Sequence, residues 1–365
     1  MAKHEKTSGE PLFHIVKRSD ISWQKAILIR AIAIVAALLV SAIVIVLIVH
    51  KNPLSIYRSM FLGAFGTKRR IWNLLQGIAI LLCISLAVTP AFKMKFWNCG
   101  AEGQALIGGL ATATVMFYMG GKVPTFVLLL SMTVASIAAG IVWAVIPAIF
   151  KAKWNTNETL FTLMMNYIAI QLVSFATKSW AKDGSGILRP MYDYGFPLLF
   201  GKEYFLNLVI VAVLTVLMYA YLKYSKHGYE LSVVGGSENT ARYVGINVKA
   251  VIIRTLVLSG AICGVAGLLL VGSTSYTVST DTVGGQGFTA IMVSWLAKFN
   301  PVYMVLTTFL LVFMRLGFRQ VSTDFRLDDS ICDIVTAIIL FFIIGCEFFI
   351  NYRVMFRSHK REELK

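Results

Sequence analysis

The sequence offers few side chains for acid–base, nucleophilic or metal chemistry, and they do not form clusters of the kind that such chemistry needs. All five histidines fall in loops or termini: His4, His14, His50, His227 and His359. The five cysteines lie in or beside apolar stretches, without a CxxC pair or a Cys/His cluster: Cys83, Cys99, Cys263, Cys332 and Cys346. A membrane-embedded enzyme needs such groups converging at one depth. The pattern therefore argues against an enzyme, a metal centre and a disulfide framework.

Charged side chains within the apolar segments are also confined to the segment ends, where each can reach a membrane interface. They are Arg30, Arg254, Arg315, Asp333 and Glu347. A proton-driven carrier uses carboxylate or histidine relays at mid-depth, and the sequence predicts none there. The neutral interior favours an uncharged cargo and an external source of energy. A secondary carrier is the alternative, and it predicts transport without ATP.

If ATP is the energy source, another polypeptide must bind it. The chain has no GxxxxGK[ST] phosphate loop, and its longest polar segments, 178–204 and 223–249, are too short to hold a nucleotide domain. We therefore expect this chain to bind no cofactor, and an ATP-driven system would hold its ATP and Mg on a partner ATPase. Segment 223–249 is the only large loop on the predicted cytoplasmic side, so we expect the ATPase to dock there.

The elements that must position these groups are membrane helices. Of the 365 residues, 57% are apolar and 14% are charged, whereas soluble globular chains carry about 25% charged residues. A soluble enzyme is excluded. The net charge is +16, but the basic residues sit in short loops between apolar runs, as topology signals do. We expect a lipid bilayer and no nucleic acid as a partner.

Nine apolar runs are long enough for membrane helices, which need about 20 residues. They are 26–49, 71–92, 104–119, 125–150, 160–177, 205–222, 250–271, 302–318 and 331–350. A tenth stretch, 287–297, is shorter and follows two glycines, which predicts a short or broken helix. The runs are continuously apolar rather than alternating, which excludes a β-barrel. The predicted fold is all-α, a polytopic bundle of about nine to ten transmembrane helices.

The basic residues also predict the sidedness of the bundle. Alternate loops carry 19 and 12 Lys+Arg residues, and the richer side is expected to be cytoplasmic. This predicts a cytoplasmic N-terminal segment 1–25, a transmembrane domain 26–350 and a cytoplasmic tail 351–365. The run Lys68-Arg69-Arg70 conflicts with that rule. We interpret 50–70 as an interfacial amphipathic stretch, with a different topology as the alternative.

Segment 223–249 carries the signals of a short, rigid helix. Ser237 can cap it, Gly245 can end it, and Asn247 can cap the next helix. With Gly235 upstream, its core reads Ala241-Arg242-Tyr243-Val244-Gly245-Ile246-Asn247. This segment resembles the coupling loop of the permeases of bacterial ABC importers, in the branch that serves simple sugars, nucleosides and branched-chain amino acids. Ser232-Val233 and Ser237-Glu238 depart from the family pattern.

Three further stretches resemble the same family. Residues 96–104 look like its Phe-Asn-Ile-Gly-Ala-Glu-Gly-Gln signature, with Trp97 and Cys99 as departures. Residues 157–167 are similar to a stretch of the nucleoside-type permeases, and residues 285–301 to a glycine-rich segment. The resemblance implies a multi-pass protein of the bacterial cytoplasmic membrane. Its implied partners are an ATPase subunit, a second permease forming a heterodimer, and an extracytoplasmic substrate-binding lipoprotein.

The resemblance and the residue types together give two sets of candidate residues. The expected coupling residues are Gly235, Glu238, Ala241, Arg242, Gly245 and Asn247. The expected substrate-path residues are Asn98, Glu102, Gln104, Asn166, Tyr167 and Trp295. Each has a structural alternative: Glu102 as a helix cap, Asn166 and Tyr167 as contacts between helices, and Trp295 as an interfacial anchor.

The function predicted from the sequence is the permease subunit of an ABC importer for a small neutral solute. Nucleosides are the first expectation, because of residues 157–167 and the neutral interior. Ribose-like sugars come next, and branched-chain amino acids third. A secondary carrier and a membrane-embedded enzyme are the alternatives from other classes.

Overall fold

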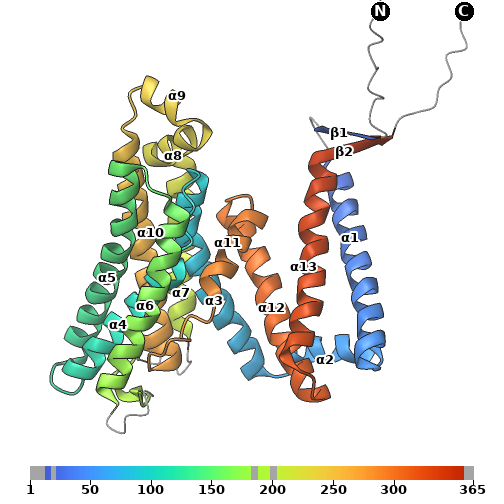
Figure 1. Cartoon of the computed structure of the whole chain (residues 1–365). Helices are drawn as coiled ribbons and strands as arrows, with labels where there is room; N and C mark the ends of the chain where they lie inside the picture. The colour runs from blue at the N-terminus through green and yellow to red at the C-terminus, as the bar shows by residue number, and fades with distance from the viewer. Residues whose placement is uncertain (1–12, 18–21, 182–187, 198–203, 357–365) are drawn as a thin grey trace, which may run out of the picture. The chain divides into compact units, whose positions relative to one another are not determined.

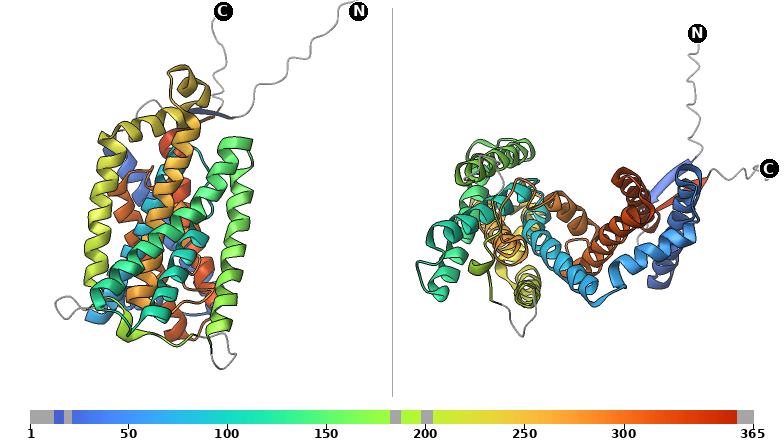
Figure 2. Two further views of the ribbon diagram at one scale, coloured as in Figure 1. Left: turned by 90° about the vertical axis from the view of Figure 1, so that its left-hand side faces the viewer. Right: turned by 90° about the horizontal axis from the view of Figure 1, so that it is seen from below.

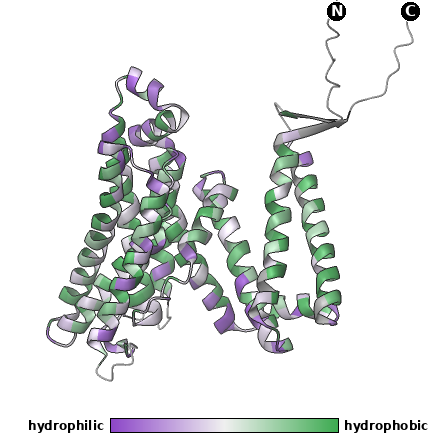
Figure 3. Cartoon of the chain, in the orientation of Figure 1, coloured by the Kyte–Doolittle hydropathy of each residue, from purple (hydrophilic) through white to green (hydrophobic). Residues whose placement is uncertain are grey.

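A computed structural model of the chain describes residues 13–17, 22–181, 188–197 and 204–356. Most of these residues are helical, which confirms the predicted all-α membrane bundle (Figure 1). They form two compact units, one of residues 67–313 and one of the two ends of the chain. Figure 3 shows that the long helices are largely apolar and that hydrophilic residues gather at α8 and α9.

The larger unit consists of helices that run mainly along one direction (Figure 1; Figure 2). They are α3 (Lys68–Lys93), α4 (Ala101–Met119), α5 (Thr125–Trp154), α6 (Glu158–Trp180), α7 (Phe205–Tyr224), α8 (Lys226–Gly236), α9 (Glu238–Tyr243), α10 (Val248–Leu270), α11 (Gln286–Leu296) and the start of α12 (Pro301–Phe325). A 3-10 turn, Tyr192–Tyr194, and a π-helical turn, Val271–Ser275, complete it. The apolar window of α10 is 78% buried, against 22% for α5, so α10 is the central helix of this unit.

Small residues let the neighbours of α10 approach its backbone. A Cβ at Gly260 would collide with the carbonyl oxygen of Gly140 on α5, and a Cβ at Gly108 on α4 would lie 2.8 Å from the Gly264 Cα. The Ser136 hydroxyl on α5 donates a hydrogen bond of 2.6 Å to the Gly264 carbonyl. The small residues at 260 and 264 thus form a packing face on α10.

The smaller unit contains two long helices and a short strand pair. Its elements are β1 (Phe13–Lys17), α1 (Trp23–Val44), a π-helical turn (Ile45–Val49), α2 (Pro53–Phe65), the end of α12, α13 (Asp329–Asn351) and β2 (Tyr352–Phe356). Helices α1 and α13 pack together, and β1 pairs antiparallel with β2, with Phe13 opposite Phe356. This ribbon adds to the predicted helices. It was not predicted because its strands meet only after α1 and α13 have paired.

Helix α2 occupies the stretch predicted to be interfacial. Asn52 caps it by accepting a 2.9 Å hydrogen bond from the Leu54 N–H, and Pro53 fits the first helical position. The Tyr57 hydroxyl donates a 2.7 Å hydrogen bond to the Leu38 carbonyl on α1. Figure 1 shows α2 crossing the ends of α1 and α13, the orientation expected of an interfacial helix. The side of the membrane on which it lies stays a prediction, as do the boundaries at 25 and 350.

Each of the nine predicted runs, and the shorter tenth, falls on a helix. Within the described residues, six helices are long and apolar enough to cross a membrane, judged by length and composition alone: α3, α5, α6, α7, α10 with its π-helical turn, and α12. Helices α1 and α13 contain shorter apolar stretches, 31–47 and 334–350. Helix α4 is not among the six, because Glu102 and Gln104 occupy its first turn. Helix α11 has 11 residues, so it spans only about 16 Å.

The packing of α5 on α10 gives the first prediction. Gly260→Ala should destabilise the protein by about 1–3 kcal/mol, because the added methyl meets the Gly140 carbonyl and the Ala144 side chain. Thermal unfolding of the full chain in detergent measures the effect. Gly345→Ala on α13 is the control, since its Cβ would meet no heavy atom within 4 Å. Equal melting temperatures for the two variants would contradict this packing.

Candidate functional site

Helix α4 begins deep inside the larger unit, after the irregular segment 94–100. The Asn98 amide nitrogen donates a 3.1 Å hydrogen bond to the hydroxyl of Ser259 on α10, roughly 17 Å along that helix from Val248. The Gly103 N–H in α4 donates a 2.9 Å hydrogen bond to the side-chain oxygen of Asn166 on α6, roughly 12 Å from Glu158. A chain that enters from one end of the bundle therefore starts its helix partway across it.

Buried amides satisfy the backbone at this start. Asn98, Gln104 and Asn166 are 0%, 1% and 4% exposed. The Asn98 oxygen accepts 3.1 Å hydrogen bonds from the Gly100 N–H and from the Gln104 amide nitrogen. The Asn166 amide nitrogen donates a 2.8 Å hydrogen bond to the Cys99 carbonyl. These predicted path residues do meet, but they are enclosed, and they bond to one another, to backbone or to the Ser259 hydroxyl. We call this cluster the α4 junction.

Glu102 joins the α4 junction to α11. One carboxylate oxygen accepts a 2.8 Å hydrogen bond from the Gly285 N–H, and the other a 2.6 Å bond from the Gly287 N–H. Glu102 is therefore a cap, as one of its two interpretations held, but it caps α11 from the first turn of α4. Two helix N-termini surround the carboxylate, and both favour a negative charge there.

Helix α11 is a half-length helix that runs from the α4 junction toward α3. Near its end, the Ser294 hydroxyl donates a 3.0 Å hydrogen bond to the Ser85 carbonyl on α3. Irregular segments come before and after this helix. Interrupted backbone is tolerated at membrane depth only where protein or water pairs its polar groups. Glu102 supplies two hydrogen-bond acceptors here, for the N–H groups of Gly285 and Gly287. The prediction of a short or broken helix is confirmed.

An aromatic pair lies where segment 94–100 approaches the end of α11. The ring centroids of Trp97 and Trp295 are 5.4 Å apart, and Phe92 lies 5.8 Å from Trp97. Trp97 and Trp295 are 44% and 49% exposed, so each offers ring surface beyond its contacts. Trp97 was not among the predicted path residues. Its departure from the family signature was the signal that could have identified it.

The outward face of α6 carries polar groups in the middle of a spanning helix. Tyr167 is 65% exposed and points about 100° around the helix from Asn166, so it does not belong to the α4 junction. Gln171 lies one turn further on and is also exposed. An amide facing lipid is costly, so this face suits a polar path or another protein. Gln171 was missed, although it interrupts the apolar run 160–177.

The predicted coupling segment folds as a capped turn of helix. The Ser237 hydroxyl accepts the Thr240 N–H at 3.3 Å, and Asn247 accepts the Ala250 N–H at 3.2 Å at the start of α10. At the other end of α9, Gly245 has a φ of 82°. The N–H groups of Gly245 and Ile246 bond the carbonyls of Arg242 and Ala241. This is a Schellman motif, in which the left-handed position favours glycine.

The predicted coupling residues divide into buried and exposed ones. Ala241 is fully buried, and Gly235 lies so close to α3 that a Cβ would collide with the Lys93 carbonyl. Glu238 and Arg242 are exposed and form an ion pair of 3.5 Å. Tyr243 is 93% exposed. It was not among the predicted coupling residues, although a buried Ala241 places the residue two positions later on the opposite side of the helix. Glu238 also lines a cleft with Lys95, Lys151 and Glu158, among others.

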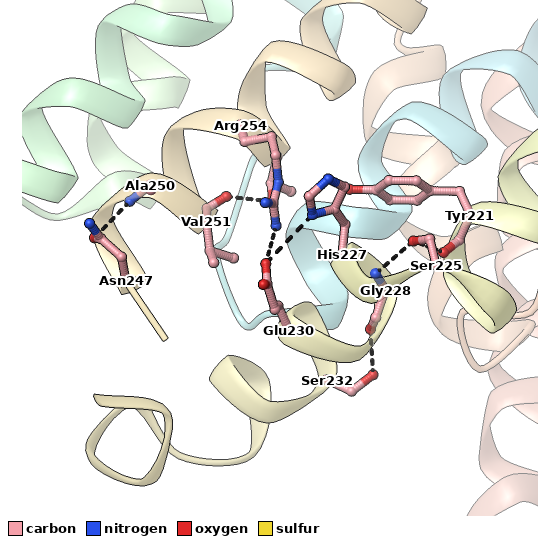
Figure 4. A network of polar contacts seen from close by, with 11 residues as sticks. Tyr221, Ser225, His227, Gly228, Glu230, Ser232, Asn247, Ala250, Val251 and Arg254 are labelled. Carbon is pink, nitrogen blue, oxygen red and sulfur yellow. Dashed lines mark hydrogen bonds and ion pairs between the residues drawn. The ribbon is translucent and has the colours of Figure 1, made fainter. Parts of the chain in front are cut away.

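A polar network holds α8 to the neighbouring helices (Figure 4). Arg254 on α10 donates a 2.7 Å hydrogen bond to the Glu230 carboxylate, and His227 lies 3.6 Å from the same oxygen. The hydrogen bond from Arg254 holds the pKa of the Glu230 carboxyl below its usual range. Through Glu230 and Gly235, α8 connects the exposed turn α9 to α10 and to the end of α3.

Comparisons with known proteins agree on one kind of protein. Residues 70–344 match a family described as "Branched-chain amino acid transport system / permease component". The guanosine ABC transporter permease protein NupP of Bacillus subtilis is 28% identical over 325 residues, which cover 87% of this chain and 92% of that protein. The nucleoside ABC transporter permease protein NupB of Lactococcus lactis is 26% identical, over 87% and 91% of the two chains. The glucose ABC transporter permease protein TsgB13 of Haloferax volcanii is also 26% identical, over 88% of each.

The α4 junction predicts different roles for two neighbouring residues of α6. Asn166→Leu should lower the free energy of unfolding by about 2 kcal/mol or more, because the Gly103 N–H and the Cys99 carbonyl lose their buried partner. Tyr167→Leu, at an exposed position, should leave stability nearly unchanged. Thermal unfolding of the purified chain compares them. A stable Asn166→Leu protein with impaired uptake would instead make Asn166 a cargo contact.

Proposed function

Because the chain belongs to the permease-component family of branched-chain amino acid transport systems, a family of multi-pass membrane transport subunits, we propose that it is the permease of an ABC importer for nucleosides. The importer lies in a bacterial cytoplasmic membrane. A separate ATPase subunit binds ATP and Mg and hydrolyses the ATP. A second, different permease completes the pore as a heterodimer, and an extracytoplasmic lipoprotein delivers the cargo.

The observation that carries the nucleoside proposal is the exposed pair Trp97 and Trp295. Stacking on aromatic rings suits any nucleobase, because every base has a π-face. The described part of the spanning helices offers neutral polar groups on the α6 face, Tyr167 and Gln171, which suit the hydroxyls of a neutral ribose. The relatives NupP and NupB support the same class of cargo by their names. The glucose permease TsgB13 supports a simple sugar as the second candidate.

The exposed turn α9 is the proposed contact with the ATPase. Its surface presents Arg242 and Tyr243, while buried Ala241 and the Schellman motif at Gly245 hold its shape. Arg242 can exchange its local partner Glu238 for a carboxylate of the ATPase, and such charge-assisted pairs are geometrically specific. Helix α8 connects α9 to α10 and α3, so a movement of α9 is transmitted to both helices through α8.

The cargo proposal predicts selective uptake. Cells that express the complete importer and lack other uptake systems should take up labelled guanosine or other nucleosides in preference to ribose, glucose or leucine. Trp295→Ala should lower nucleoside uptake about five-fold or more, from the loss of one stacking contact. Trp154→Ala, which removes an exposed indole at the end of α5, is the matched control. Uptake of leucine or a sugar but not of nucleosides would overturn the cargo assignment and leave the permease assignment standing.

The coupling proposal predicts a loss of communication without a loss of fold. Arg242→Glu should abolish cargo-stimulated ATP hydrolysis in the reconstituted importer and leave the melting temperature of the permease unchanged, because Arg242 is exposed. Lys249→Glu makes the same charge change at another exposed position, seven residues along the chain, and should keep the stimulation. The proposal fails if Arg242→Glu retains full stimulation, or if both variants lose it equally.

A further inference from the structure

We propose that Glu102 is a positioning residue of the transport cycle: its carboxylate holds the start of α11 against the start of α4 and so fixes the aromatic face of α11. The inference rests on the proposed function for its effect on transport. The contact itself is independent of the identity of the cargo. It assigns Glu102 a role other than binding the cargo, and it makes α11 the element that Glu102 controls.

The contact is specific because it needs a particular residue on each side. Both oxygens of Glu102 accept backbone N–H groups, from Gly285 at 2.8 Å and from Gly287 at 2.6 Å. Gly287 must be a glycine for α11 to come this close, since a Cβ there would lie 2.5 Å from the Glu102 nitrogen and 2.8 Å from its Cα. A shorter or neutral side chain at 102, or any side chain at 287, disturbs the same contact.

The backbone on both sides of α11 has the form of a hinge. Gly284 and Gly285 before it, and Lys298 and Phe299 after it, all have positive φ values between 51° and 73°. Left-handed backbone at Lys298 and Phe299 carries strain, because L-residues with side chains rarely adopt it. Changes at a few such positions can turn a short helix as a unit. The bonds that hold α11 at its two ends are therefore the points at which its position is controlled.

Those end bonds differ in kind. At the far end, the Ser294 hydroxyl bonds the Ser85 carbonyl and lies 3.1 Å from the Thr89 hydroxyl, all buried neutral groups. At the near end, the acceptor is the partly exposed carboxylate of Glu102. Hydrogen bonds to a charged acceptor are stronger than neutral ones. Glu102→Gln removes the charge and leaves one accepting oxygen for two N–H groups. A single substitution at Glu102 can therefore release the near end of α11 while the far end stays bonded.

The released helix would carry an exposed apolar stripe with it. Phe288, Met292 and Trp295 follow one another at helical spacing on α11 and are 46%, 41% and 49% exposed. Trp295 is half of the aromatic pair assigned to the nucleobase. A change at Glu102 should therefore alter the rate of transport through the position of α11, without removing any group that contacts the cargo.

The first test is a double-mutant cycle in the full chain. Glu102→Gln and Gly287→Ala should each lower the melting temperature and the maximal nucleoside uptake rate, and the double variant should be no worse than the more severe single one, since both break one contact. The maximal rate should fall by a larger factor than the KM rises, because Trp295 is still present on the released α11. Asp281→Asn and Gly345→Ala, at positions outside the contact, are the matched controls. Additive effects, or a KM that rises while the maximal rate is kept, would overturn the proposal and make Glu102 a cargo ligand.

The second test reads the position of α11 without any cargo, so it stands even if the nucleoside assignment fails. Met292→Cys is introduced with Cys99→Ser, and labelling by a maleimide is measured in membranes against the same chain without the new thiol. Glu102→Gln should change the labelling rate of residue 292 about tenfold, the factor expected for losing a hydrogen bond to a charged acceptor. Asp281→Asn should not change it. An unchanged rate in a folded Glu102→Gln protein would show that Glu102 does not position α11.

Discussion

The structure depends on one constraint: a backbone that is interrupted inside a membrane must still pair its N–H and C=O groups. Helices α4 and α11 both begin within the larger unit, and their first N–H groups have no partner within their own helix. Asn98 and Asn166 supply the partners for α4, and Glu102 supplies them for α11. That requirement explains the positions of Asn98, Asn166 and Glu102 in this apolar chain.

The same requirement brings the exposed features of the chain together. Neither segment 94–100 nor helix α11 is part of a continuous spanning helix. Because the helices are interrupted here, Trp97 and Trp295 lie side by side. The predicted coupling segment contacts this region at two places. Gly235 on α8 touches the end of α3 just before segment 94–100, and Glu230 bonds α10, which also carries the Ser259 hydroxyl that pairs with Asn98.

The sequence predicted the features that depend on local pattern. Apolar runs located the helices, and Ser237, Gly245 and Asn247 were sufficient to predict the short helix α9 and its ends, because caps and turns act over three or four residues. The partners of the α4 junction could not be predicted, since Glu102 and Gly285 are 183 residues apart in the chain. Whether an amide faces a neighbouring backbone or a path depends on helix rotation, which separates enclosed Asn166 from exposed Tyr167.

Hydrogen–deuterium exchange of the full chain in lipid nanodiscs tests the central claim most directly. We predict slow exchange for peptides that cover residues 98–104 and 285–289, close to that of the buried helix α10, because their N–H groups are bonded to Asn98, Asn166 and Glu102. Peptides from the exposed turn α9 give the fast reference. If the two junction peptides exchange as fast as α9, their backbone is not held by these side chains, and the account of the interrupted helices is wrong.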